Sequence, residues 1–483
     1  MAASRARWIN VPLLRVARLC AAMLFVLLGH VTLIQAFGSS ALNADRRNER
    51  PLIDRYAHPR GDILTYDGTP IATSLPSGGG PYRYRRVYRH GEQYAAVTGH
   101  VSLHRSTGIE QAQDGVLSGD DAKVKVRSMV REGGVEGADV RLTISDRAQR
   151  AAYEGLAATG VPGAAVAIDP ATGAIRALAT YPSYDPNGLT TFDRARLAEE
   201  TRRLRRAPAQ PLLNRALNQL YPPGSTFKLV TTAAALASGE YTPSALVDAP
   251  ARLRLPGTPT YVHNASNCGS ARPTLMYAFQ MSCDTAFANI GLQVGQDLLR
   301  DQAEAFGFNA TGLRIPLTAT PSHYPPAMDR SQTALAAIGH HDNRVTPLMV
   351  AMLSAAVANH GVLMRPYLVE EVRLADGSVI NRAGPVPYRT AVSPELARYL
   401  AAMMTMVTHA GGTGAGAAIP GVLVAAEAAT SQALPGAGDH ALVTAFAPAE
   451  APEVAVGVVL ERPGERADAV SAIARGIIEA ELS

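Results

Sequence analysis

Hydrophobic and polar positions divide the chain into three stretches with different patterns. The first is apolar: no formally charged residue occurs from Leu19 to Phe37, and a helix of that length spans roughly 28 Å, close to the hydrocarbon thickness of a bilayer. Four arginines lie within the first 18 residues, and the next one is Arg46. This pattern predicts a single-pass membrane anchor at 19–37, with a cytoplasmic tail at 1–18 and the remainder outside the membrane.

A cleaved signal peptide is the alternative interpretation of this segment. Ala36-Phe37-Gly38 is a poor small-residue cleavage site. The apolar stretch is also longer than the roughly 7–15 residues that are usual in such signals. We prefer the anchor, and cleavage stays open.

The second stretch, 38–160, has an irregular pattern of short strand-like runs separated by turns. Its last part alternates polar and apolar residues, as a strand with one solvated face does, and an alanine-rich run follows. We interpret it as a non-catalytic N-terminal module. The expected elements are strands at 59–64, 70–72 and 139–144 and a helix at 146–158.

The third stretch, 161–483, has continuous apolar runs at both ends and helical patterns between them. Hairpins at the ends with helices in the middle are typical of an α+β domain, in which helices flank an antiparallel sheet. The expected strands are 164–169, 174–179, 422–426, 441–446 and 453–460. The expected helices are 229–238, 285–294, 346–359 and 468–482.

Composition narrows the classes of function. Hydrophobic residues make up 47% of the chain and charged residues 18%, which favours folded domains over disorder. The formal net charge is only +4, and the arginine run at 202–206 fits a solvated helix face, so we expect no nucleic-acid partner. The GxxxxGK[ST] and GxGxxG patterns do not occur, and His340 and His341 have no partners at metal-ligand spacing. We therefore expect neither a cofactor nor a metal site.

The three cysteines fall in different environments. Cys20 lies in the expected anchor, whereas Cys268 and Cys283 lie in the part expected outside the membrane. Oxidising conditions there permit a disulfide between Cys268 and Cys283. Two free buried thiols are the alternative, and both interpretations stay open.

The segment 221–228 carries the strongest chemical signal. Two prolines and a glycine would end any helix or strand that precedes them, and the apolar run that follows can form a helix. Ser225 then lies in the first turn, with Lys228 one turn on and on the same face. A serine nucleophile needs a base to take its proton, and an amine at this spacing can do so. We interpret Ser225 as a nucleophile and Lys228 as its general base; a plain helix N-cap is the alternative.

Pro223-Gly224-Ser225-Thr226-Phe227-Lys228 resembles the active-serine motif of class B penicillin-binding proteins. The similarity covers nearly the full chain and is greatest to the actinobacterial penicillin-binding protein A group. It implies a penicillin-binding fold and a D,D-transpeptidase that crosslinks peptidoglycan stem peptides through an acyl-serine, blocked by β-lactams. Further matching segments are Arg60-Gly61-Asp62-Ile63, Asp169-Pro170-Ala171-Thr172-Gly173 and Tyr184-Asp185-Pro186-Asn187.

The family's second motif, Ser-x-Asn, corresponds to Ser282-Cys283-Asp284. The resemblance makes Ser282 a proton relay. Asp284 stands where the family has asparagine, so a carboxyl replaces an amide.

The third motif, Lys-Thr-Gly, is replaced completely. The expected strand at 422–426 leads into Glu427-Ala428-Ala429, and Thr430 follows. In the family this lysine and threonine bind the substrate's terminal carboxylate. Glu427 offers the opposite charge, Ala428 has no hydroxyl, and Ala429 adds a methyl group where glycine allows close approach.

These replacements change the expected charges around Ser225. Two lysines and a neutral amide become Lys228, Asp284 and Glu427, or one positive and two negative groups if all are ionised. Nearby carboxylates favour the charged form of Lys228, whereas a base must be neutral to act. The loss of a charged hydrogen bond to the substrate costs about 1.5–3 kcal/mol. We therefore expect acylation slowed by roughly 10²-fold or more.

Three functions are compatible with this pattern. The first is a peptidoglycan transpeptidase with weakened activity or low β-lactam affinity. The second is a catalytically impaired scaffold for cell-wall synthesis or division proteins, since a fold alone does not establish an activity. The third is a β-lactam-binding receptor or resistance protein.

Overall fold

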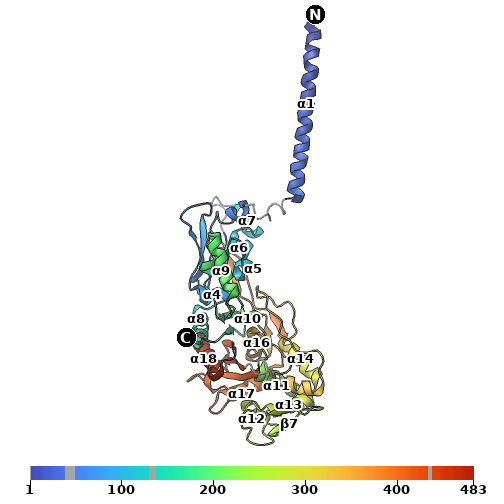
Figure 1. Ribbon diagram of the computed structural model, residues 1–483. Helices are drawn as coiled ribbons and strands as arrows, with labels where there is room; N and C mark the ends of the chain where they lie inside the picture. The colour runs from blue at the N-terminus through green and yellow to red at the C-terminus, as the bar shows by residue number, and fades with distance from the viewer. Residues whose placement is uncertain (1, 39–48, 130–136, 433–437) are drawn as a thin grey trace. The chain divides into compact units, whose positions relative to one another are not determined.

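The computed structural model describes residues 2–38, 49–129, 137–432 and 438–483 (Figure 1). The chain divides into two compact units. One comprises the chain up to His58 together with Gly78–Arg83, and the other comprises Pro59–Ser77 and Tyr84–Ser483. The second unit contains all the strands and most of the helices described below.

The first unit is dominated by one long helix, α1 (Ala2–Leu33), followed by the short π-helix η1 (Ile34–Gly38) and by α3 (Arg50–Arg55). Leu13–Phe37 is long and apolar enough to cross a membrane, alone among the helices that the structure describes. This span begins six residues before the predicted 19–37 because a helix with a highly apolar centre can include Arg15 and Arg18 near its end. Its apolar side chains are exposed, as lipid contact requires: Phe25 is 79% exposed.

The second unit contains a six-stranded sheet in the order β11 (Val379–Arg382), β10 (Val369–Arg373), β4 (Asp139–Leu142), β1 (Ile63–Leu64), β2 (Pro70–Pro76), β3 (Tyr84–Tyr88). The strand expected at 59–64 is limited to Ile63–Leu64, the one expected at 70–72 extends to Pro76, and the one expected at 139–144 ends at Leu142. The β10–β11 hairpin was not expected here. It pairs with β4, and Arg141 donates to the buried Glu371 at 3.3 Å across 230 residues of sequence. The pattern of either segment alone contains no signal for this pairing.

A buried cluster of charges stabilises the loop beside this sheet. Glu110, in α5 (Gly108–Ala112), is fully buried and accepts two hydrogen bonds from Arg60 at 3.0 and 3.1 Å. Its other oxygen contacts the buried Arg86. Burial alone would raise the pKa of Glu110, but Arg86 and Arg60 outweigh burial and lower it. The cluster is therefore ionised, and each charge depends on the others.

The second sheet of this unit is antiparallel throughout, in the order β13 (Ala425–Gln432), β14 (Asp439–Ala447), β15 (Val454–Leu460), β5 (Gly163–Ile168), β6 (Ile175–Tyr181). Alternate residues of β5 enter two separate hydrophobic clusters. On one face α8 (Asp146–Thr159) and α18 (Ala469–Leu482) pack side by side (Figure 1), and on the other lies α16 (Pro347–Ala358). The predicted α+β arrangement, with helices on an antiparallel sheet, is confirmed.

Most predicted helices and strands of this sheet agree with the structure to within two residues, but the strand at 422–426 was misplaced. The strand begins at Ala425 and continues to Gln432, in register with β14 from Phe446 to Asp439. The apolar run before Ala425 suggested the wrong segment. Pairing with β14, which is tertiary, sets the true limits, and it places positions 427–430 inside an edge strand.

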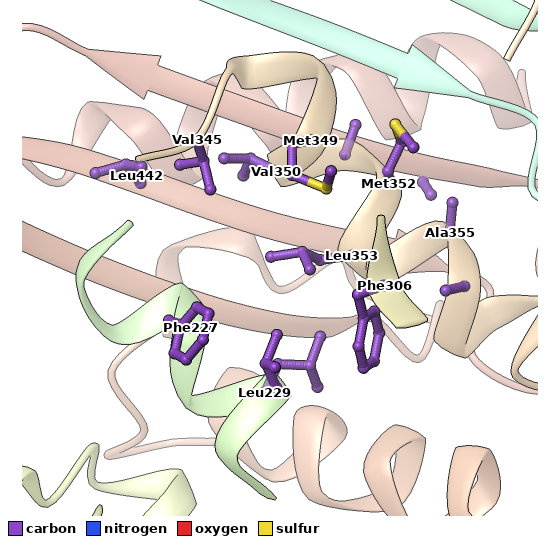
Figure 2. Packing of buried hydrophobic residues seen from close by; sticks show 14 of the residues in the cluster. Phe227, Leu229, Phe306, Val345, Met349, Val350, Met352, Leu353, Ala355 and Leu442 are labelled. Atoms are coloured by element: carbon purple, nitrogen blue, oxygen red, sulfur yellow. The ribbon is translucent and has the colours of Figure 1, made fainter. Parts of the chain in front are cut away.

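Helices α11 (Lys228–Ala237), α13 (Asp284–Val294) and α14 (Gln296–Phe306) pack against one another, and α14 also contacts α16. Phe227 and Leu229, the neighbours of Lys228, belong to the same buried cluster as Phe306 and Leu353 (Figure 2). The start of α11 is thereby held in the core, and the reactive segment next to it has a firm support.

Candidate active site

Ser225 lies in a single 3₁₀ turn, η3 (Gly224–Phe227), that runs directly into α11. Ser225 is half-buried and lines a cleft, whereas Lys228 is fully buried. Phe227 stacks on Tyr324 and meets Phe308 edge-on, both at 5.5 Å between ring centroids. The aromatic contacts fix the turn, so Ser225 is presented from a rigid support rather than from a flexible loop.

Two glycines allow β13 to approach this turn closely. Gly224 has φ of +53° and donates its N–H to Gly339 O at 3.1 Å. A Cβ atom on Gly224 would lie 2.8 Å from the Thr430 carbonyl oxygen, and one on Gly339 would lie 2.0 Å from the Gly224 oxygen. Both positions need glycine: a side chain at 224 would push β13 away from the turn, and one at 339 would collide with the backbone of Gly224.

Ser282 connects the expected base to the expected nucleophile. It lies at φ +53° in the turn between α12 (Leu275–Gln280) and α13. Lys228 Nζ donates to Ser282 Oγ at 2.8 Å, and Ser282 Oγ in turn donates to Ser225 Oγ at 2.9 Å. The three side chains form one hydrogen-bonded chain, the arrangement that a proton relay through Ser282 requires.

Among the described residues no direct hydrogen bond joins Lys228 to Ser225, although their spacing in the sequence suggested one. Its ammonium has three N–H groups, and these go to Ser282 O, Ser282 Oγ and Asp284 Oδ1, at 2.8, 2.8 and 2.6 Å. The one-turn spacing thus correctly predicted that Lys228 and Ser225 belong to one site, but it did not predict that Ser282 connects them. Ser282, from a distant segment, connects the two groups through hydrogen bonds of its Oγ.

Asp284 forms an ion pair with Lys228 at 2.6 Å. It lies in the first turn of α13, where the partial positive charge of the helix start stabilises a carboxylate. The contact takes the place that a neutral amide would occupy in the Ser-x-Asn pattern.

Glu427 behaves differently from the expectation. Its side chain is fully buried, and neither carboxyl oxygen has a hydrogen-bond partner among the described residues. Burial raises the pKa of Glu427 well above its usual range; Lys228 lowers it and Asp284 raises it, with smaller effects. Burial therefore favours the protonated form of this carboxyl. The expectation of a negative charge at Glu427 is disfavoured by the fold.

This protonation predicts a pH-dependent stability. Below pH 4.5 Glu427 is protonated in both the folded and the unfolded chain. Above pH 4.5 the unfolded chain loses this proton, whereas the folded chain keeps it up to the raised pKa. The free energy of unfolding therefore falls by about 1.4 kcal/mol per pH unit over that range. Glu427→Gln cannot ionise. Its melting temperature in detergent, relative to wild type, should therefore increase from pH 4.5 to 7.5. Glu450→Gln, at an exposed position, should give no such trend; equal trends in both variants would contradict the assignment.

The cleft beside Ser225 has a volume of about 410 Å³. Three of the sequence-predicted substrate positions, Ala428, Ala429 and Thr430, line it, whereas Glu427 does not. The cleft is also lined by His340, Asp439 and Asp468. These residues come from distant segments, so no local pattern placed them beside Ser225, and His340 had been considered only as a metal ligand.

Cys268 and Cys283 form a disulfide in the structure, with their Cα atoms 6.0 Å apart. Cys283 lies between Ser282 and Asp284, the two residues that contact Lys228. The bond therefore ties the second motif to the loop that precedes α12.

Comparison with known proteins gives a consistent result. Residues 163–479 match the family model of the penicillin-binding protein transpeptidase domain, and residues 60–139 match that of the penicillin-binding protein A dimerisation domain. The peptidoglycan D,D-transpeptidase PbpA of Mycolicibacterium smegmatis is 39% identical over 475 residues, which cover 95% of each chain.

Solved structures agree with these matches. The ceftriaxone acyl-enzyme complex of penicillin-binding protein A from M. tuberculosis has a TM-score of 0.86 and 37% identity, and the match covers 89% of this chain and all of that one. The penicillin G acyl-enzyme complex of the same protein has a TM-score of 0.84 and 36% identity, with 88% of this chain and all of that one covered. With the Ser225, Ser282 and Lys228 geometry, these similarities show that the chain belongs to the class B penicillin-binding proteins, in the penicillin-binding protein A group.

Proposed function

We propose that this protein is a peptidoglycan D,D-transpeptidase that acts through an acyl-Ser225 intermediate and acylates more slowly than its relatives. The observation that carries the proposal is the hydrogen-bonded chain from Ser225 through Ser282 to Lys228 at an open cleft. Relatives of high similarity over nearly their whole length bear the name of this activity.

The chemistry follows from the positions of these groups. When Lys228 is a free amine, Ser225 passes its proton to Ser282 Oγ while Ser282 passes its own to Lys228 Nζ. Ser225 Oγ then attacks the carbonyl carbon of the donor peptide, and the departing amine takes the proton back through the same chain. A second amine attacks the acyl-serine and completes the crosslink.

The edge position of β13 supports a peptide substrate. An edge strand leaves one row of backbone groups without a strand partner, and an extended peptide can pair with it. Ala428, Ala429 and Thr430 of this strand line the cleft beside Ser225. A donor peptide laid along β13 would bring its scissile bond to the nucleophile.

Two features account for slow acylation. Asp284 contacts Lys228 Nζ at 2.6 Å, and this contact must break before the amine can accept a proton. Neither Glu427 nor Ala428 can bind a terminal carboxylate as the Lys-Thr-Gly residues of the family do. Reduced β-lactam affinity follows from the same two features.

The anchor sets where the reaction occurs. We place residues 1–18 in the cytoplasm, the helix within 13–37 in the membrane, and the module at 38–160 and the transpeptidase domain at 161–483 outside, where the peptidoglycan lies. The module then extends toward cell-wall synthesis or division proteins that share the membrane. This orientation rests on the arginines that precede the span.

Labelled penicillin tests the proposed function. Purified full-length protein should gain the mass of one penicillin on Ser225, slowly, and Ser225→Ala should gain none because the nucleophile is gone. Lack of an adduct at high concentration and long incubation would contradict the proposal. Peptide mapping of the adduct identifies the modified residue.

A non-catalytic scaffold is the second candidate, favoured by the ion pair that occupies Lys228. Complementation separates it from the enzyme. A scaffold needs the fold but not the hydroxyl, so Ser225→Ala would rescue a deletion strain as well as wild type does. Failure of Ser225→Ala alone, at equal protein level, would exclude a purely structural role.

A further inference from the structure

Asp439 and Asp468 line the cleft beside Ser225, and the described lining residues include no lysine or arginine to pair with them. Asp284 also lines the cleft, but its charge is paired with Lys228 at 2.6 Å. His340 is the remaining titratable group, and burial lowers its pKa, so it is neutral at pH 7. An anion that enters the cleft meets charges of its own sign.

Lys228 cannot supply the missing positive charge. It is fully buried behind the cleft, and its three N–H groups are already donated to Ser282 and Asp284. A ligand carboxylate would have to displace one of these partners to reach it. The ion pair with Asp284 also cancels most of its charge at longer range.

The wall formed by β13 offers no cationic group, and its one polar lining side chain is that of Thr430. Glu427 is fully buried and lies outside the cleft lining, so it does not contact a ligand in the cleft. Ala428 and Ala429 present methyl groups. Thr430 is exposed and contributes one hydroxyl, which can donate to a neutral carbonyl as well as to a carboxylate.

We propose that this cleft selects acyl donors whose leaving group carries no free carboxylate, such as peptides with an amidated or esterified terminus. This inference rests on the proposed function and specifies its substrate. Discrimination arises from repulsion of the free acid by the cleft carboxylates rather than from new contacts to the neutral donor.

The reaction itself is unchanged by this selection. Ser225 Oγ forms a bond to the donor carbonyl carbon, the carbon–nitrogen bond breaks, and the serine proton ends on the departing nitrogen. With an amidated or esterified terminus the leaving group is a neutral or cationic amine. Its departure past Asp284 and Asp439 is then not opposed by charge.

Benzylpenicillin and its methyl ester provide a matched pair of probes, because they deliver the same acyl group and differ at one carboxyl. Full-length protein in detergent is incubated with each compound, and the acylation rate constant is measured by intact mass. The adducts differ by one methyl group, so the mass shows which compound reacted. Each rate constant is divided by that for hydroxide hydrolysis of the same compound, which removes the difference in intrinsic reactivity.

We expect the ester to acylate Ser225 at least 10-fold faster than the acid after this correction. Salt provides a second measurement that needs no variant: raising ionic strength should speed acylation by the acid and leave the ester unchanged, because salt screens the repulsion. A faster acid, or a salt response equal for both probes, would overturn the inference.

Ala428→Lys places a cation on β13 at a position that lines the cleft, and it should shift the preference toward the acid by at least 10-fold. Ala428→Thr adds a hydroxyl at the same position without the charge and should leave the ester preferred. An unchanged preference in Ala428→Lys, if it folds, counts against the inference; the salt series decides if it does not fold. Absence of an adduct from both probes would refute the proposed function, whereas an adduct with the acid preferred would refute only the selectivity.

Discussion

Replacement of Asp284 by asparagine is expected to raise the rate constant for acylation of Ser225 by about 10- to 100-fold. The change removes the carboxylate that contacts Lys228 at 2.6 Å and leaves an amide of similar shape. An amide binds Lys228 Nζ less strongly than a carboxylate does, so breaking this contact before proton transfer costs less. A charge-assisted contact of this kind is worth about 1.5–3 kcal/mol, which corresponds to the expected factor.

The measurement should use the neutral penicillin ester, because its binding does not respond to charge in the cleft. The rate is followed by intact mass under identical conditions for the variant and wild type. Asp297→Asn is the matched control: it makes the same substitution in the first turn of α14, outside the cleft lining. A variant no faster than wild type would show that Asp284 does not restrain the base.

Replacement of Glu110 by alanine is expected to destabilise the second unit by about 3–5 kcal/mol. Glu110 is fully buried and neutralises Arg60 and Arg86, which are 4% and 2% exposed. Its removal leaves two guanidinium groups in the interior with one partly exposed partner, Asp114, and the cost of an uncompensated buried charge is of that size.

Pulse proteolysis of the detergent-solubilised full chain across a urea series gives the stability of this region. Asp114→Ala serves as the control. It removes a contact to the same Arg60, at 2.9 Å, but from a side chain that is 44% exposed, so the expected loss is under about 1 kcal/mol. If both variants lost the same free energy of unfolding, burial of Glu110 would add nothing to the strength of its ion pairs with Arg60 and Arg86.

The reactive pair was predictable because its geometry is local. Two prolines and a glycine before an apolar run placed Ser225 at the start of a helix, and a spacing of three residues placed Lys228 near it. The helices and most strands of the penicillin-binding domain were predictable for the same reason. Their hydrophobic periods are fixed within ten or fifteen residues, and α11, α13 and α16 begin within one residue of expectation.

Strand β13 marks the limit of local reasoning. The apolar residues before Ala425 looked more like a strand than the polar segment after it. Pairing with β14 extends the strand through Gln432 and determines which side chains point into the core. A shift of one residue exchanges the two faces of a strand, and no property of the segment itself sets that register. This register decides that Glu427 points into the core, where burial raises the pKa of its carboxyl.

The amino-acid sequence by itself determined which reactive groups the protein has: a serine and a lysine one turn apart, an aspartate in place of an amide, and no lysine at the strand beside them. Only the tertiary structure decided how these groups are used. Lys228 takes its partners from residues 54 and 56 positions away, and Glu427 loses its charge because the fold removes it from water. Both outcomes depend on contacts and burial between distant segments, and neither spacing nor composition within a single segment specifies them.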